Sequence, residues 1–164
     1  MADQPEDDFQ TAFWNAKRTL AEASEVAYRR HGVHAGQQFI LRELWREDGQ
    51  TPGQISRRLG LATPTVTKMT SRMEAAGLVQ RRPHASDRRL VRIHLTERGR
   101  LLQEVMTDEM QQVTERELQA LRPEDRTLLV RLLGQVHRNL ATAAGPGKPL
   151  SSGESLVVAG SNGG

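Results

Sequence analysis

Arginine is concentrated in one short stretch of this 164-residue chain. The segment "RRPHASDRRLVR", residues 81–92, holds five arginines in twelve positions. Because like charges this close together repel one another, the stretch makes most sense beside an anionic partner. Residues 51–100 carry eleven Lys or Arg against three Asp or Glu, a net charge of +8, whereas the remainder carries twelve basic and seventeen acidic residues, a net charge of −5. This distribution indicates a surface for a polyanion, although a solvated charged face would give the same pattern.

A second pattern with chemical meaning is the segment "TPTVTKMTSRMEAA", residues 63–76. Val66, Met69 and Met73 recur at helical spacing and predict a buried side. The opposite side carries short side chains and only two cations, where a helix normally exposes long charged residues. Short side chains allow close approach to another surface, and hydroxyls can bond phosphates or base edges. The residues of this side are Pro64, Thr67, Lys68, Ser71, Arg72 and Ala75, with Thr65 at its margin.

The elements that must position these residues are mainly helical. An apolar seam over residues 9–27 predicts a long helix that ends near Gly32, and a second helix is expected from about Ala35. Thr51-Pro52 is typical of an N-cap followed by a proline in the first turn of a third helix. Thr63-Pro64 repeats this start signal for the segment described above.

Beyond Gly77 the hydrophobic period changes from helical to alternating. "LVQRR" and "RLVRIHL" predict two strands joined by a turn, after which Thr96 caps a long helix and Pro123 begins a last helix with a broad apolar stripe. Two short helices followed by a two-stranded ribbon predict a mainly α fold, a winged helix-turn-helix with a two-stranded β-wing and long N- and C-terminal helices.

The segment from "TPGQISRRLG" to "VRIHLTERG" resembles the DNA-binding core of the multiple antibiotic resistance regulator (MarR) family. Three motifs carry the resemblance: "SRMEAAGLV", an Asp-x-Arg pattern at Asp87 and Arg89, and "HLTERG". Including the flanking helices, it covers residues 8–142. It implies a DNA-binding lobe over residues 33–99 and dimerisation helices over residues 8–32 and 100–142. Composition separately predicts a frayed N-terminus at residues 1–7 and a disordered Gly/Ser/Pro-rich tail at residues 143–164.

The resemblance implies a homodimeric, sequence-specific transcriptional regulator, a repressor that binds an inverted-repeat operator in double-stranded DNA. Its recognition helix, residues 63–76, would enter the major groove and its wing, residues 81–92, would reach the minor groove. Arg72 has an alternative role, bracing the wing from within the protein. The DNA-binding residues carried over are Thr63, Pro64, Thr65, Thr67, Lys68, Ser71 and Arg72 on the helix, with Arg88, Arg89 and the bracing Asp87 on the wing. The dimer agrees with the apolar seams of the first and last helices, which exceed what one small lobe could cover.

Many members of the family release DNA when a small aromatic or anionic ligand binds between the dimerisation helices and the DNA-binding lobe. The resemblance implies such an effector here, and Trp14, His34 and Arg42 are the candidates to bind it, with Tyr28 and Trp45 as further possibilities. An arginine could pair with a carboxylate while indole or imidazole packs against a ring. The alternative is that the tryptophans belong to the hydrophobic core and that Arg42 is a solvated helix residue without a ligand.

Other classes of function have little support. The absence of cysteine excludes disulfides and thiolate zinc sites, and no phosphate loop, nucleophile elbow or compact metal-ligand cluster is present. We therefore expect no enzyme activity, no cofactor and no metal. The start has no signal-peptide pattern and no long apolar run occurs, which predicts a soluble cytoplasmic protein. A winged helix that contacts an acidic protein partner remains the alternative function.

Overall fold

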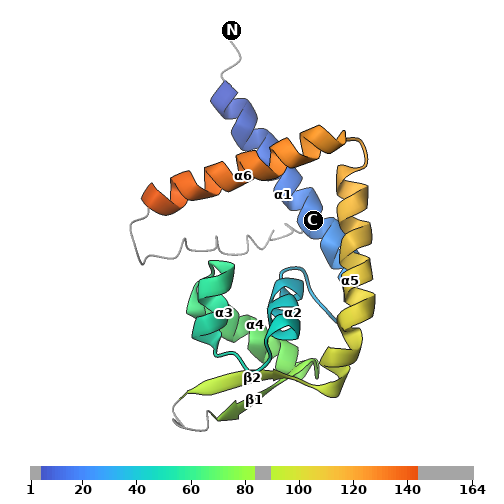
Figure 1. Ribbon diagram of the computed structural model, residues 1–164, viewed down its shortest axis with the longest axis vertical. Helices are drawn as coiled ribbons and strands as arrows, with labels where there is room; N and C mark the ends of the chain where they lie inside the picture. The colour runs from blue at the N-terminus through green and yellow to red at the C-terminus, as the bar shows by residue number, and fades with distance from the viewer. Residues whose placement is uncertain (1–4, 84–89, 144–164) are drawn as a thin grey trace, which may run out of the picture.

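The structure is a computed structural model, and it describes residues 5–83 and 90–143. Within these ranges the regular elements are helices and one antiparallel pair of strands (Figure 1). The elements are α1 (Pro5–Arg29), α2 (Gln37–Arg46), α3 (Pro52–Leu59), α4 (Thr63–Ala75), β1 (Val79–Pro83), β2 (Val91–Leu95), α5 (Glu97–Leu118) and α6 (Pro123–Ala143). The predicted mainly α winged helix is confirmed. Helix α1 begins at Pro5, so it includes the last three residues of the segment that was expected to be frayed.

The lobe formed by α2, α3, α4 and the two strands has a dry core. Ile40, Ile55, Val66 and Ile93 are completely buried and Val79 of β1 is 1% exposed, so each of these elements contributes at least one side chain to the buried core. Burying a side chain of this size stabilises a fold by about 1.5–3 kcal/mol. The core therefore fixes α4 against the sheet, with the opposite side of α4 free.

The two short helices begin differently. Thr51 caps α3 as expected, in a capping box with Gln54, and Gly60 ends that helix in the left-handed conformation with φ 66°. Helix α4 has Ala62 at its N-cap and no side-chain cap, so the expectation that Thr63 repeats the cap is wrong. Thr63 is instead the first helical residue, and its hydroxyl lies 3.0 Å from the hydroxyl of Ser56 on α3. Thr63 therefore links α3 to α4 and does not cap α4.

The wing sheet is anchored to the α2–α3 connection. β1 and β2 pair antiparallel, with Val79 opposite Leu95, and the N–H of Ile93 also donates to the carbonyl oxygen of Gln50 at 2.8 Å. Asp48 accepts the N–H of Leu95 at 2.8 Å. These two contacts, one from the Gln50 backbone and one from the Asp48 side chain, hold the sheet in a fixed position, and the alternating pattern of the strands did not predict them.

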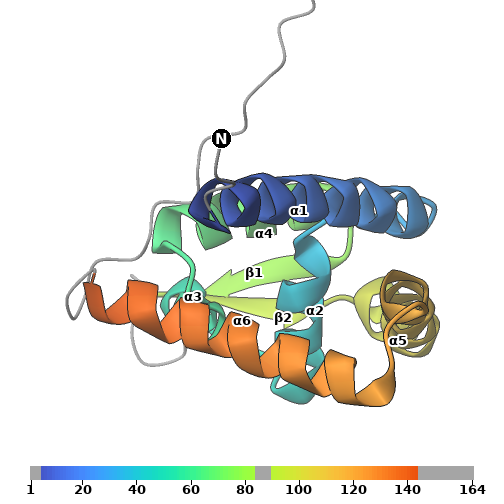
Figure 2. The ribbon, with the colours of Figure 1, turned by 90° about the horizontal axis from the view of Figure 1, so that it is seen from above.

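Helices α1, α5 and α6 extend beyond the lobe. α5 rises from β2 along α1 and leads to α6, which runs as a separate rod (Figures 1 and 2). Glu109 of α5 is only 4% exposed and is held by Arg30, His31 and Arg116. Burial favours a higher pKa for Glu109, but hydrogen bonds from Arg30 and His31 outweigh it and lower the pKa. A charged junction therefore fixes the end of α1 on α5.

Within residues 5–83 and 90–143, no element covers the apolar stripe of α6. Every large apolar side chain of α6 that is described between Leu128 and Leu133 is exposed, as is Leu140. Phe9 and Phe13 of α1 are also exposed and stack on each other with ring centroids 5.8 Å apart. None of the helices in the described ranges is long and apolar enough to cross a lipid bilayer.

Candidate nucleic-acid interface

The free side of α4 carries the short polar side chains that the helical spacing predicted. The predicted outer residues of this helix are exposed and Thr65 is half-buried, while Val66 and Met73 face the core. Thr70 is completely buried, a position that the apolar pattern did not indicate. The exposed residues are Thr63, Pro64, Thr67, Lys68, Ser71, Arg72 and Ala75.

The hydroxyl groups on this side are bonded within the helix. Thr67 Oγ1 donates to the carbonyl oxygen of Thr63 at 2.9 Å, and Ser71 Oγ donates to the carbonyl oxygen of Thr67 at 3.0 Å. These bonds to the preceding turn fix the rotamers and keep the side chains flat against the helix. Because they are flat, a flat or grooved surface can approach the α4 backbone closely.

The two cations of this side are available to an external partner. Within residues 5–83 and 90–143, neither the side chain of Lys68 nor that of Arg72 makes a hydrogen bond or ion pair with the protein. Arg58 of α3 differs, because it pairs with Glu47 at 2.5 Å and with Glu43 at 3.4 Å. Its neighbour Arg57 is exposed and makes no such pair in the described part of the chain. The free positive charge therefore lies on α4 and at Arg57, not at Arg58.

The wing continues the basic surface from α4. Arg82 of β1 is exposed, and Arg92, directly opposite it on β2, donates to the carbonyl oxygen of Gly49 at 2.9 Å. The wing residues assigned to DNA from the sequence, Asp87, Arg88 and Arg89, lie outside the described residues. What the structure places beside α4 is therefore the base of the wing.

Arg81 is a residue that sequence reasoning did not single out. Its guanidinium turns back onto α4, where Nη2 lies 2.9 Å from the carbonyl oxygen of Thr67 and 2.5 Å from Ser71 Oγ. The bracing of the wing that was considered for Arg72 is performed by Arg81 and Glu74. A sequence signal existed, because Arg81 and Arg82 must point to opposite faces of a strand and only one of them can face α4.

Comparison with known proteins identifies the family of this arrangement. Residues 34–91 match the model of the MarR family. The regulator PecS of Dickeya dadantii, an HTH-type transcriptional regulator, is 34% identical over 124 residues, which cover 74% of this chain and 75% of PecS. The chain belongs to the MarR family. This membership places it among transcriptional regulators, as the sequence predicted, and not among enzymes.

Two further relatives extend the comparison. The HTH-type transcriptional regulator TtmR of Methylorubrum extorquens is 36% identical over 89 residues, 54% of this chain, and the chain spans less than half of TtmR, 42% of its length. The structure of reduced AbfR bound to DNA superposes with a TM-score of 0.66 at 29% identity, covering 83% of this chain and 94% of AbfR. A protein that is similar to this chain over nearly its whole length therefore has a structure bound to DNA.

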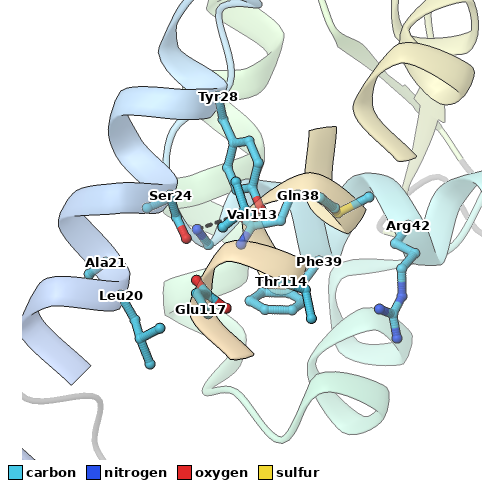
Figure 3. A pocket seen from close by; sticks show the side chains of 13 residues that line it. Leu20, Ala21, Ser24, Tyr28, Gln38, Phe39, Arg42, Val113, Thr114 and Glu117 are labelled. Carbon is cyan, nitrogen blue, oxygen red and sulfur yellow. Dashed lines mark hydrogen bonds between the residues drawn. The ribbon is translucent and has the colours of Figure 1, made fainter. Parts of the chain in front are cut away.

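This MarR-family chain also has a cavity of about 450 Å³ between α1, α2 and α5 (Figure 3). Of the three candidate effector residues, the structure places Arg42 in its lining, opposite Glu117 in the view of Figure 3. Burial raises the pKa of Glu117, and it also raises the pKa of Tyr28, another lining residue, so that the phenol remains a donor. The cavity thus combines a permanent cation with groups that donate when protonated.

The other two candidate effector residues lie elsewhere. Trp14 is 57% exposed and does not line this cavity. His34 is outside it as well, because its Nδ1 lies 2.7 Å from Glu25, whose carboxylate also accepts the N–H of Ala35. Burial favours a higher pKa for Glu25, but the bonds from Ala35 and His34 outweigh it and lower the pKa. Within the described residues, no cluster of three or more His, Asp or Glu is arranged to hold a metal ion.

Proposed function

We propose that this MarR-family chain acts as a homodimeric, sequence-specific DNA-binding repressor. Each protomer places α4 in the major groove and its wing, residues 81–92, at the adjacent minor groove. Two α4 helices related by a two-fold axis read the two halves of an inverted repeat. Transcription is repressed because the bound dimer covers the promoter.

The observation that carries the proposal is the composition of the free side of α4. Short hydroxyl side chains held flat on the helix let it enter a groove, while Lys68 and Arg72 supply positive charge that none of the described residues neutralises. Phosphates attract such cations, and the base edges offer partners to hydroxyls. An acidic protein partner would need the charge but not the flat, hydroxyl-bearing helix.

The exposed apolar faces of α1 and α6 support the homodimer. A groove of about 610 Å³ between α1, α5 and α6 is lined mainly by apolar side chains, Leu20 and Leu133 among them. A second copy of the chain that buries these faces would remove them from water. Dimerisation also doubles the basic surface and fixes the distance between the two α4 helices.

We further propose that a small aromatic anion in the Arg42 cavity releases the protein from DNA. A carboxylate would pair with the guanidinium of Arg42, and the aromatic ring would pack beside Phe39, another lining residue. The cavity lies where α2 of the lobe meets α1 and α5, so a ligand there would favour one orientation of the lobe relative to the dimer helices.

The proposal is tested by selecting bound sequences from a random DNA pool at about 150 mM salt. Enrichment of an inverted repeat with half-sites about 10 base pairs apart is the expected result. Recovery of DNA with no shared sequence would reduce the interaction to charge and favour the acidic protein partner. A panel of aromatic carboxylates added to the enriched complex then tests release, with simple aliphatic carboxylates as the control.

A further inference from the structure

The base of the wing and the recognition helix are joined by one side chain. Arg81 Nη2 lies within hydrogen-bond distance of three oxygens of α4: the carbonyl oxygen of Thr67 at 2.9 Å, Thr70 Oγ1 at 3.2 Å and Ser71 Oγ at 2.5 Å. A guanidinium Nη carries two hydrogens, so these three acceptors share them. The shortest of the three distances is to Ser71, the only exposed hydroxyl in the set.

Glu74 keeps Arg81 in this position. One of its carboxylate oxygens accepts the backbone N–H of Arg81 at 2.9 Å, and the other lies 3.6 Å from the guanidinium Nε. The guanidinium is planar and always charged, so the carboxylate on one side and the hydroxyls on the other fix its orientation. Arg81 therefore stays on α4 and is not free to extend toward a phosphate, unlike Arg82 beside it.

The hydrogen bonds of Ser71 determine what its hydroxyl can offer to DNA. A carbonyl oxygen can only accept, so the Ser71 hydroxyl must donate its one hydrogen to the carbonyl oxygen of Thr67. Arg81 can only donate, so it occupies one of the two Ser71 lone pairs. One lone pair remains on this exposed group. Ser71 thus faces a partner as a hydrogen-bond acceptor and not as a donor.

An acceptor discriminates among the chemical groups of DNA. Phosphate oxygens are themselves acceptors and would not pair with it. In the major groove, adenine presents its N6 amino group and cytosine its N4 amino group as donors, whereas guanine and thymine present acceptors at the corresponding edges. We propose that Arg81 is a positioning residue that holds Ser71 as an acceptor, and that Ser71 selects adenine or cytosine at one position of each half-site. This proposal rests on the DNA-binding function proposed above.

Thr67 provides an internal comparison on the same helix. Its hydroxyl donates to the carbonyl oxygen of Thr63 at 2.9 Å, but no arginine in the described residues bonds the hydroxyl oxygen of Thr67. The Thr67 hydroxyl also donates to a carbonyl oxygen but is held by this single partner, so it can rotate more readily on binding than the Ser71 hydroxyl and serve as donor or acceptor. Loss of Arg81 should change the base preference opposite Ser71 and leave that opposite Thr67 unchanged.

The test compares the base preferences of four proteins, selected from the same random pool under the same salt: wild type, Ser71→Ala, Arg81→Gln and Arg82→Gln. Arg82→Gln is the matched control, because it removes the same charge from the next residue of the same strand without touching α4. We expect wild type to favour adenine or cytosine by about fivefold or more at one position of each half-site. We expect Ser71→Ala and Arg81→Gln to lose this preference, and Arg82→Gln to keep it while binding all sequences more weakly.

The outcomes separate this proposal from the proposed function. A wild-type protein that enriches no sequence overturns both. A wild-type protein that enriches an inverted repeat, beside an Arg81→Gln variant with the same base preferences at every position, overturns the positioning role alone. Should Arg81→Gln fold poorly, as a lowered thermal midpoint of unfolding would reveal, Arg81→Lys replaces it. Lysine keeps the charge but lacks the planar fork, so it should retain affinity while losing most of the selectivity opposite Ser71.

Discussion

Two arginines near the proposed DNA surface differ in what already binds them. The Arg72 side chain has no partner among the described residues, whereas Arg58 is held by the carboxylates of Glu43 in α2 and Glu47 directly after it. A free guanidinium can pair with guanine or with phosphate at little cost, while a paired one must first leave its carboxylates. Exposure alone would not distinguish them, because both side chains reach the surface.

We therefore expect Arg72→Ala to weaken binding to the selected operator by about 1–3 kcal/mol, with relaxed preference at one base position if the contact is to a base. Arg58→Ala is the control and should change operator affinity less than threefold, on the order of the effect of one surface charge. Fluorescence titration of labelled operator DNA with each variant measures both. Equal losses in the two variants would mean that bulk charge, and not the α4 surface, sets the affinity.

At the scale of single residues, the sequence predicted the free side of α4 correctly, because helical spacing alone decides which residues share a side. It could not predict that Arg81 folds back while Arg82 stays exposed. The two residues are chemically identical neighbours, and only the register of β1 against β2 and the position of Glu74 distinguish them. Nor could it predict that Thr63 bonds Ser56, since that contact depends on how α3 and α4 meet.

At the scale of elements, the junction of β2 and α5 depends on Thr96 and Gly99, both part of the "HLTERG" motif. Thr96 Oγ1 accepts the N–H of Gly99 at 3.0 Å and lies 2.7 Å from the carbonyl oxygen of Gly77. A Cβ at Gly99 would lie 2.1 Å from the carbonyl oxygen of Leu78, so the first turn of α5 packs directly on backbone. Glycine is required here because of this close approach, and its φ is not in the left-handed region.

Gly99→Ala should accordingly destabilise the fold by about 2–4 kcal/mol, because backbone must move to admit the methyl group. Gly53→Ala is the matched control in α3, where the nearest atom to an added Cβ is a side-chain nitrogen of Arg57 at 3.8 Å. There alanine should be neutral or stabilise by up to about 1 kcal/mol. Chemical denaturation at one fixed protein concentration measures both, and equal stabilities of the two variants would contradict the packing argument.

The helices and strands themselves were largely predictable, because capping residues, positive-φ glycines and the change of hydrophobic period each act locally. Gly32 and Gly77 both adopt positive φ at the helix ends where the sequence placed them. The contacts of the α2–α3 connection with β2 were not predictable, since Gln50 and Asp48 carry no strand pattern. They depend on the path of the connection through space.

At the scale of the whole molecule, the apolar residues of the chain divide into two sets. One set forms the core of the lobe and continues through Tyr28 and Met106 to α1 and α5. The other, on α1 and α6, is exposed in the single chain although its helical spacing is as regular as that of the first. Sequence periodicity predicts that both sets are buried, but it cannot say in which chain the covering atoms lie. The same limit applied to the effector candidates: Arg42 and the further possibility Tyr28 line the cavity, whereas Trp14 and His34 do not.

In the proposed dimer, the groove between α1, α5 and α6 would decide whether the protein reads one half-site or two. Leu129 and Leu133 of α6 line it and are 37% and 44% exposed, so Asp at both positions would place two charges in the proposed dimer interface. We expect this double variant to be monomeric by analytical ultracentrifugation and to bind the inverted repeat at least about 100-fold more weakly, because the two half-sites are then bound independently.

Thr127→Asp adds a charge to the same helix two residues before Leu129, a rotation of about 200° that puts it on the opposite side. Thr127 is the fifth residue of α6, close to the N-terminal end of the helix, where a negative charge is tolerated, so the helix itself should not be destabilised. This control should remain dimeric with unchanged operator affinity. A double variant that stays dimeric would exclude the groove as the interface. One that becomes monomeric while keeping wild-type affinity would mean that a single α4 helix is sufficient, and an inverted repeat would then have no physical reason to be selected.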